Sequence, residues 1–353
     1  MMKRFSRIIA AAIALASLLT LCSCSLQISE DGKEWCAFEV IEAPTYTKKG
    51  VLRRTAKDGT QSEDVSLKAA KKLAYSIDED GGYYVSGIGD CRDEIIYISP
   101  RTPDGNEVTG ILDGAFAECE NLKHVVVGEG ISLIADTAFI ACPDLLSVTL
   151  PDSVVSFGAY AFYDCDSLVD IKLGKDLISI PDCAFMNCDK LSAISIPNSV
   201  TAIGSCAFTN CCSIEAFDLP ADLEKLGSGA FSGCTEIKTL VLPDKITQIP
   251  SSLFSGCTAL CEFTIGDNIK AIYHNAFRGC TALDSLYIPA NVTEMEVDYQ
   301  EGPFTSCRNL TLLCEAPEAP EGWDDGFDTC FYTMSDEGYV PFKLVCKFGE
   351  EKR

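Results

Sequence analysis

Cysteine is the residue type with the most chemistry available to it in this chain, and its spacing is regular. The sequence holds 20 cysteines in 353 residues. One set of cysteines follows a phenylalanine by three residues, and all but the last of these Phe/Cys pairs recur every 23 residues. The set comprises Cys119, Cys142, Cys165, Cys188, Cys211, Cys234, Cys257, Cys280 and Cys307. We interpret it as a ladder of buried free thiols, because an unpaired cysteine packs as a small apolar residue.

Catalytic use of a thiol would require a histidine within reach and an acid that orients it. The chain has two histidines. His124 falls on an expected strand and His274 on the far side of a coil, and the repeat places no fixed acid beside either. The sequence has no Cys-x-x-Cys pair, Gly-x-Ser-x-Gly turn, phosphate-binding loop or calcium loop. We therefore expect no enzyme activity, no cofactor and no metal centre.

Cys183 and Cys206 lie outside the ladder, at the same repeat position on neighbouring coils. Other coils have Thr137, Tyr160, Gly229 and Asn275 there, a mixture typical of a surface. We predict a Cys183–Cys206 disulfide as a candidate, and we expect Cys212 to point outward beside buried Cys211. A pair among Cys314, Cys330 and Cys346 is a candidate staple for the C-terminal segment. Connectivity does not follow from sequence.

The elements that position these residues follow from the same period. Phe185, Cys188 and Leu191 are three apart, a spacing that suits one helical or 3-10 turn. Ile194 and Ile196 are two apart, which places both on one face of a short strand that a Pro or Gly then ends. Stacked coils would share one apolar core. The sequence therefore predicts a repeat solenoid of 23-residue period, with a parallel β ladder on one face and short helical or 3-10 turns on the other.

The pattern Leu-x-x-Ile-x-Leu-Pro-x-x-Val-x-x-Ile-x-x-x-Ala-Phe-x-x-Cys resembles the BspA-like leucine-rich repeats of bacterial surface proteins. The resemblance extends from about Tyr83 to Phe327 and includes an opening coil and a closing segment. The departures are Leu253 and Pro303 before their phenylalanines, and a four-residue insertion within Glu294–Gly302, expected to bulge. The fold alternative is a parallel β-helix, which the Phe-x-x-Cys turn disfavours. The resemblance implies adhesion.

The N-terminus reads as an export signal. Basic residues precede an apolar run from Ile8 to Leu19, too short to span a membrane. The ending Leu21-Cys22-Ser23-Cys24 resembles a bacterial lipoprotein box, which implies cleavage before Cys24 and lipid on its sulfur. The alternative is an ordinary secretory signal with incidental cysteines. Both place the mature chain outside the cytoplasm, and the first places it lipid-anchored at the bacterial cell surface.

The predicted organisation is a signal peptide at 1–23, a spacer or small cap at 24–82, the solenoid at 83–313 and a closing segment at 314–353. Within the cap we expect a strand over Glu34–Val40 and a helix over Ser62–Tyr75, the latter from its alanines and leucines.

The formal net charge of −24 argues against nucleic acid as a partner, because phosphate contacts need clustered Lys and Arg. We predict instead that outward-facing strand residues form a protein-binding ribbon. Its members are His124, Val126, Thr149, Asp170, Lys172, Ser195, Asp218, Val241, Glu262, Thr264, Ser285 and Tyr287. The predicted function is a membrane-anchored surface lipoprotein that binds host or neighbouring-cell proteins. The alternatives are a non-catalytic envelope spacer, a glycan-targeting module, and a hydrolase or its substrate-targeting module.

Overall fold

The computed structural model describes residues 35–56, 61–298, 301–335 and 338–351. The chain contains two compact units, Met1–Lys68 and Ala69–Arg353. The predicted signal peptide and Cys24 lie outside the described residues.

The first unit contains a three-stranded antiparallel sheet. Its strands are β1 (Trp35–Glu42), β2 (Gly50–Ala56) and β3 (Ser62–Leu67), in the order β1-β2-β3. Arg53 on β2 donates from Nε and Nη2 to both carboxylate oxygens of Asp64 on β3, at 2.8 and 3.0 Å. The strand predicted at Glu34–Val40 is confirmed by β1.

The helix predicted over Ser62–Tyr75 is wrong, because β3 occupies the start of this range and β4 (Ala74–Ile77) begins at its end. Each residue from Ser62 to Leu67 pairs with β2, so strand pairing overrides local helix propensity. Ala70 and Leu73 are instead buried, and the Ala70 N–H donates to the carbonyl of Tyr97 at 2.9 Å.

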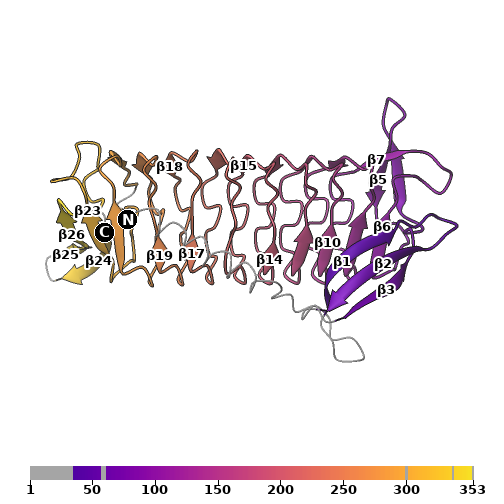
Figure 1. The fold of residues 1–353 in the computed structure, drawn as a ribbon, viewed down its shortest axis with the longest axis horizontal. Coiled ribbons are helices and arrows are strands. Elements are labelled where there is room, and N and C mark those ends of the chain that lie inside the picture. Colours follow the sequence, from indigo (N-terminus) through magenta and orange to yellow (C-terminus); the bar gives the residue numbers. More distant parts are fainter. Residues whose placement is uncertain (1–34, 57–60, 299–300, 336–337, 352–353) are drawn as a thin grey trace, which may run out of the picture. The chain divides into compact units, whose positions relative to one another are not determined.

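The second unit is a solenoid in which coil follows coil along one axis (Figure 1). The first ladder is parallel, and in the central coils its register advances by 23 residues, as in Ser147↔Asp170, with larger steps toward both ends. Its strands form three successive sheets. The first contains β6 (Ile95–Ile98), β8 (His124–Val127), β10 (Ser147–Thr149), β12 (Asp170–Lys172) and β14 (Ala193–Ile194), the second β17 (Thr239–Leu240) and β19 (Glu262–Phe263), and the third β21 (Ser285–Ile288), β23 (Thr311–Cys314) and β26 (Val345–Phe348). The predicted fold class is confirmed.

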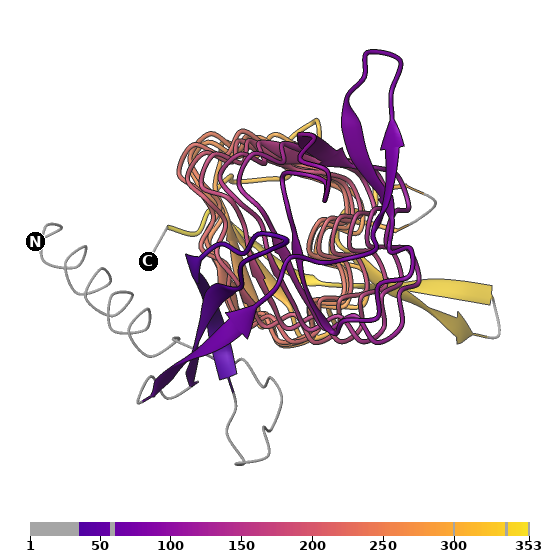
Figure 2. The same cartoon turned by 90° about the vertical axis from the view of Figure 1, so that its right-hand side faces the viewer.

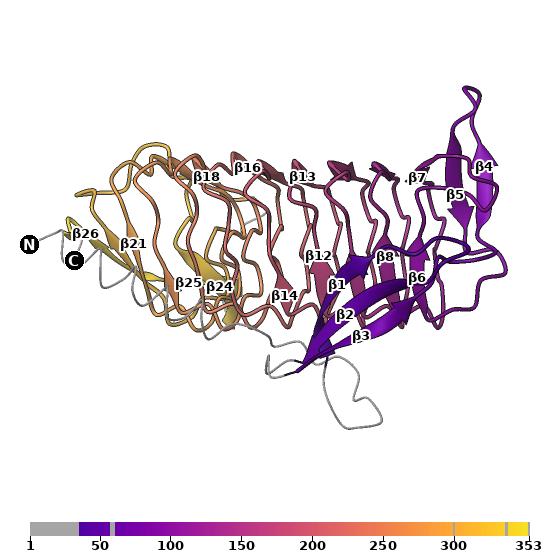
Figure 3. The ribbon, with the colours of Figure 1, turned by 45° about the vertical axis from the view of Figure 1, so that its right-hand side comes forward.

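A second parallel ladder, which the sequence analysis did not predict, runs along another face of the solenoid (Figure 3). Its strands also form three successive sheets. The first contains β5 (Tyr83–Gly87), β7 (Val108–Ile111), β9 (Leu133–Ile134) and β11 (Ser156–Phe157), the second β13 (Ser179–Ile180), β15 (Ala202–Ile203) and β16 (Lys225–Leu226), and the third β18 (Gln248–Ile249), β20 (Ala271–Ile272) and β22 (Glu294–Met295). Most have two residues, so they show little of the alternation that marks a strand in sequence. At the N-terminal end, β4 pairs antiparallel with β5.

The segment around each Phe-x-x-Cys is a series of turns, and no helix occurs in the described part of the chain. The Cys188 N–H donates to the Phe185 carbonyl at 3.1 Å, as a 3-10 turn requires. A continuous helix does not form because Asn187, between them, has a φ of 62°, in the left-handed region. The position two residues before each Phe of the repeat, apart from Phe304, is left-handed as well, with Cys183 at 53° and Cys206 at 55°.

A stack of phenylalanine rings fills the core, and the coils superpose when viewed down the axis (Figure 2). Phe116, Phe139, Phe162, Phe185, Phe208, Phe231, Phe254, Phe277 and Phe304 are fully buried. Neighbouring ring centroids in this stack are 4.9 to 6.0 Å apart.

The ladder cysteines lie beside the phenylalanine stack and are buried, as predicted. From Cys142 onward each thiol also donates to the carbonyl of the Phe in the preceding coil, for example from Cys188 to Phe162 at 3.1 Å. The hydrogen bond satisfies a thiol that burial would otherwise leave without a partner.

The C-terminal end carries the hairpin of β24 (Thr329–Ser335) and β25 (Gly338–Lys343), and β26 adds to β23 in parallel. Trp323 is buried there, and its Nε1–H donates to the Val292 carbonyl at 3.0 Å. The described residues include no helix long and apolar enough to cross a membrane.

Candidate functional site

The predicted ribbon on the first ladder is exposed only in part. The strand register places His124 and Val126 on the same face as exposed Lys172, as predicted, but both are buried, so the expectation that they are exposed is wrong. Thr149, Asp170 and Tyr287 are half-buried. The exposed members are Lys172, Ser195, Asp218, Val241, Glu262, Thr264 and Ser285. We name these seven residues the exposed ribbon.

Val241 is the one large apolar residue among the seven residues of the exposed ribbon, and 74% of its surface is exposed to solvent. It shares a repeat position with Asp218 and Thr264 on the two flanking coils, and the strand pairing Leu240↔Phe263 aligns it with Thr264. Single exposed apolar residues are common on protein surfaces, so the significance of Val241 lies in its place on an extended repeat face, the kind of surface through which solenoids bind.

Three polar side chains form a column on successive strands near the N-terminal end of the first ladder. They are His124, Ser147 and Asp170. His124 Nδ1 and Ser147 Oγ are 2.8 Å apart and both residues are buried. Burial raises the pKa of Asp170 to about 7. A nucleophilic triad needs the histidine between the serine and the acid. Here the serine occupies the middle place and substrate has no access, so the column is not a catalytic site.

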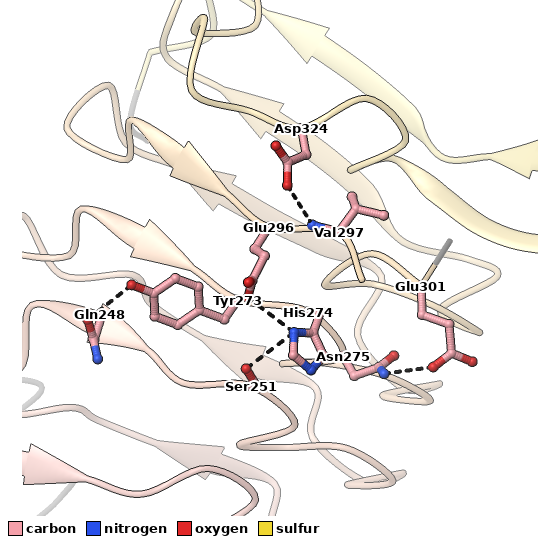
Figure 4. Close-up of polar contacts among 9 residues, drawn as sticks. All are labelled: Gln248, Ser251, Tyr273, His274, Asn275, Glu296, Val297, Glu301 and Asp324. Atoms are coloured by element: carbon pink, nitrogen blue, oxygen red, sulfur yellow. Dashed lines mark hydrogen bonds and ion pairs between the residues drawn. The ribbon is translucent and has the colours of Figure 1, made fainter. Parts of the chain in front are cut away.

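A second histidine cluster surrounds the four-residue insertion (Figure 4). His274 Nδ1 lies 3.1 Å from Glu296 Oε2 and 3.4 Å from Ser251 Oγ. The acid beside His274 is therefore not one that the repeat supplies, because Glu296 lies one residue off the 23-residue period. In a catalytic relay, however, the serine and the acid bind different ring nitrogens. Because both partners meet Nδ1, the contacts position the imidazole without activating the serine.

The same cluster attaches the insertion to the preceding coil. The Asn275 amide donates to Glu301 Oε2 at 2.8 Å, and Arg278 forms a 3.5 Å ion pair with the same oxygen. On the other side, the Val297 N–H donates to Asp324 Oδ2 at 3.1 Å. These are contacts between exposed or half-buried groups. Within the described ranges, no three His, Cys, Asp or Glu side chains are arranged to hold a metal ion.

Cys183 and Cys206 are free thiols in the structure, so the predicted bridge between them is not formed there. Both are half-buried, as is Cys212, while Cys211 beside it is fully buried as expected. Cys314 is buried and Cys346 half-buried, and the side chain of Cys330 lies outside those described, so the staple among these three stays a prediction. Cys261, which the sequence analysis did not single out, is exposed.

Comparison with known proteins identifies the repeat. A family model described as the BspA type leucine rich repeat region matches residues 102–211 and 178–311, in six copies. No curated protein matches the chain.

Solved structures share the fold. A leucine-rich repeat protein from Bacteroides ovatus is 22% identical with a TM-score of 0.54, over 73% of this chain and 68% of that chain. A T. pallidum leucine rich repeat protein is 27% identical with a TM-score of 0.46, over 62% and 90%. A leucine rich cell surface protein from Faecalibacterium prausnitzii is 20% identical with a TM-score of 0.33, over 71% and 94%. At these levels the similarity concerns the fold alone.

Proposed function

Because this chain belongs to the BspA-type leucine-rich repeat family, we propose that it is a non-catalytic bacterial surface protein whose solenoid binds another protein through the exposed ribbon. The partner would be a host or neighbouring-cell component, which makes the protein an adhesin. The observation that carries the proposal is Val241, 74% exposed within a polar surface that continues over successive coils. Solenoids bind through such extended faces because each coil adds one row of contacts.

The location in this proposal rests on the N-terminal sequence. Lipid on Cys24 would attach the protein to the membrane, and two or more acyl chains give stable anchoring where one chain is marginal. The solenoid would then be presented outside the cytoplasm.

Charge narrows the chemistry of the partner. The exposed ribbon carries Asp218 and Glu262, and Glu215 and Asp284 lie exposed beside them. The basic residues are Lys172, at the N-terminal end of the exposed ribbon, and Lys238, which pairs with Glu215 at 3.7 Å. A cationic partner surface with an apolar side chain for Val241 would complement this face, and acidic partners would be repelled.

The test measures binding of the purified full chain to an array of extracellular matrix and bacterial surface proteins at physiological salt. Poly-lysine serves as a control for charge alone. We expect a saturable hit that Val241→Glu and Asp218→Lys each weaken. The matched control is Ile178→Glu, because Ile178 is also a well-exposed aliphatic residue, at 55%, but precedes a strand of the second ladder.

Equal weakening by Ile178→Glu, or a hit that only poly-lysine reproduces, would contradict the proposal. Absence of any protein hit for a folded chain would favour the spacer, and binding to glycans on the same surfaces would favour the glycan-targeting module.

A further inference from the structure

Cys183 and Cys206 occupy the same position on neighbouring coils, two residues before Phe185 and Phe208. The backbone is left-handed at both residues, and the Cys183 N–H donates to the Ser205 carbonyl at 2.8 Å. This bond holds the two coils in register directly beside the thiols. Both side chains therefore leave the coil in the same direction, and both are half-buried.

The two thiols and one phenol form a connected group. The Tyr160 hydroxyl and the Cys206 thiol lie close enough to the Cys183 thiol to influence its pKa, which burial raises. Cys206 Sγ also lies 3.8 Å from the Ser228 carbonyl, over Gly229. A Cβ built on Gly229 would lie 3.3 Å from that sulfur, so the glycine leaves room for it.

The distance between adjacent coils favours a metal ion bound between the two sulfurs over a disulfide bond that joins them. Parallel strands lie about 4.8 Å apart, whereas a disulfide requires Cβ atoms about 3.5–4.5 Å apart. In-register side chains on adjacent coils exceed this distance unless the backbone moves. Two thiolates on opposite sides of one ion, each at about 2.3 Å as in metal–thiolate bonds, are separated by about 4.6 Å.

We propose that Cys183 and Cys206 form a two-coordinate site for a soft monovalent cation of the copper(I) class. Thiolate ligands select such ions. On binding, each thiol loses its proton to solvent and its sulfur gains a bond to the ion, so one cation replaces two protons and nothing is oxidised or reduced. The Tyr160 hydroxyl donates to the Cys183 sulfur and orients this ligand.

The other thiols lack this arrangement. The ladder thiols donate to phenylalanine carbonyls in the core and are closed to solvent. Among the described residues, the partly or fully exposed cysteines are Cys183, Cys206, Cys212, Cys261 and Cys346. Of these five, Cys183 and Cys206 alone occupy one repeat position on adjacent coils. They alone can therefore hold an ion from both sides across the distance between two coils.

The experiment titrates the reduced full chain with silver(I), under anaerobic and chloride-free conditions, in excess monothiol competitor, and counts retained ions by native mass spectrometry. A single thiol loses to the competitor, whereas a chelating pair gains about 100-fold or more in apparent affinity. We expect the count to fall by one in Cys183→Ser and by one in Cys206→Ser. Cys261→Ser is the matched control and should leave the count unchanged. Tyr160→Phe keeps both thiols and should weaken retention several-fold.

The number of retained silver ions is measured separately for each serine variant. If one variant does not fold, the other still tests the proposal. An unchanged count in a folded Cys183→Ser or Cys206→Ser variant would overturn the proposal. Recovery of the pair as a disulfide, resistant to alkylation until reduced, would overturn it as well.

Discussion

Truncation of one ring in the phenylalanine stack should destabilise the protein by an amount that depends on its place in the stack. Phe208 is fully buried and contacts three rings: Phe185 at 5.3 Å, Phe231 at 5.9 Å and Phe217 at 4.9 Å between centroids. Phe116 is equally buried but meets one described ring, Phe139 at 4.9 Å. The two positions therefore differ in aromatic contacts and not in burial.

The magnitude follows from these contacts. Burial of a phenylalanine side chain contributes about 2–3 kcal/mol, and each ring pair adds about 0.5–1.5 kcal/mol. Phe208→Ala should lower the free energy of unfolding by about 5 kcal/mol, at the upper end of the usual range for Phe→Ala. Phe116→Ala should lower it by about 3 kcal/mol.

The assay is urea denaturation followed by circular dichroism, with amide hydrogen exchange to locate the loss. Exchange is needed because repeat arrays can unfold in parts. Protection should fall most in the coils on both sides of residue 208. An equal loss for the two variants, or a larger loss for Phe116→Ala, would refute the view that ring stacking carries the difference.

Three further predictions concern thiols, backbone and pH. In the native protein at pH 8, iodoacetamide should modify Cys261, which is exposed, but not Cys257, because burial raises the pKa of Cys257 to about 12. Peptide mass mapping that finds both cysteines modified would contradict this. The side chain of Asn187 makes hydrogen bonds with Asp164 at 2.6 Å and Asn210 at 2.8 Å, and its backbone is left-handed. Asn187→Ala should lower the free energy of unfolding by about 1–2 kcal/mol more than Asn187→Gly, because both lose the hydrogen bonds but only alanine is strained in this conformation. Equal denaturation midpoints for the two variants would rule this out. Asp170 has a raised pKa of about 7, so the native state holds a proton that the unfolded chain loses near pH 4, and the free energy of unfolding should fall from pH 4 to 7. Asp170→Asn should flatten that dependence, and an unchanged slope in this variant would disprove the assignment.

The candidate site was only partly predictable from sequence. The 23-residue period correctly indicated which residues share a column, so Asp218, Val241 and Thr264 were expected at one position on three coils, and they are exposed there. The same reasoning placed His124 and Val126 on the surface, where they are not. Periodicity assigns a residue to a face of a strand, but burial depends on what else packs against that face.

The acid beside His274 was missed for a related reason. Glu296 is 22 residues after His274, one short of the period, and it precedes the inserted residues that displace the last coil. A strict repeat would align Val297 with His274. The structure nevertheless brings the Glu296 carboxylate to the imidazole (Figure 4).

The sequence by itself determined the length of each coil, the phenylalanine and cysteine columns and the parallel first ladder. These depend on spacing along the chain, and stacked coils repeat that spacing as contacts. Tertiary structure alone decided the second ladder, the left-handed residues that replace a helix, and the bond from each ladder thiol to a carbonyl one coil away. Each of these depends on hydrogen bonds between coils, which form only when neighbouring coils pack. Two-residue strands and single left-handed residues are also too short to produce a hydrophobic pattern that would reveal them in the sequence.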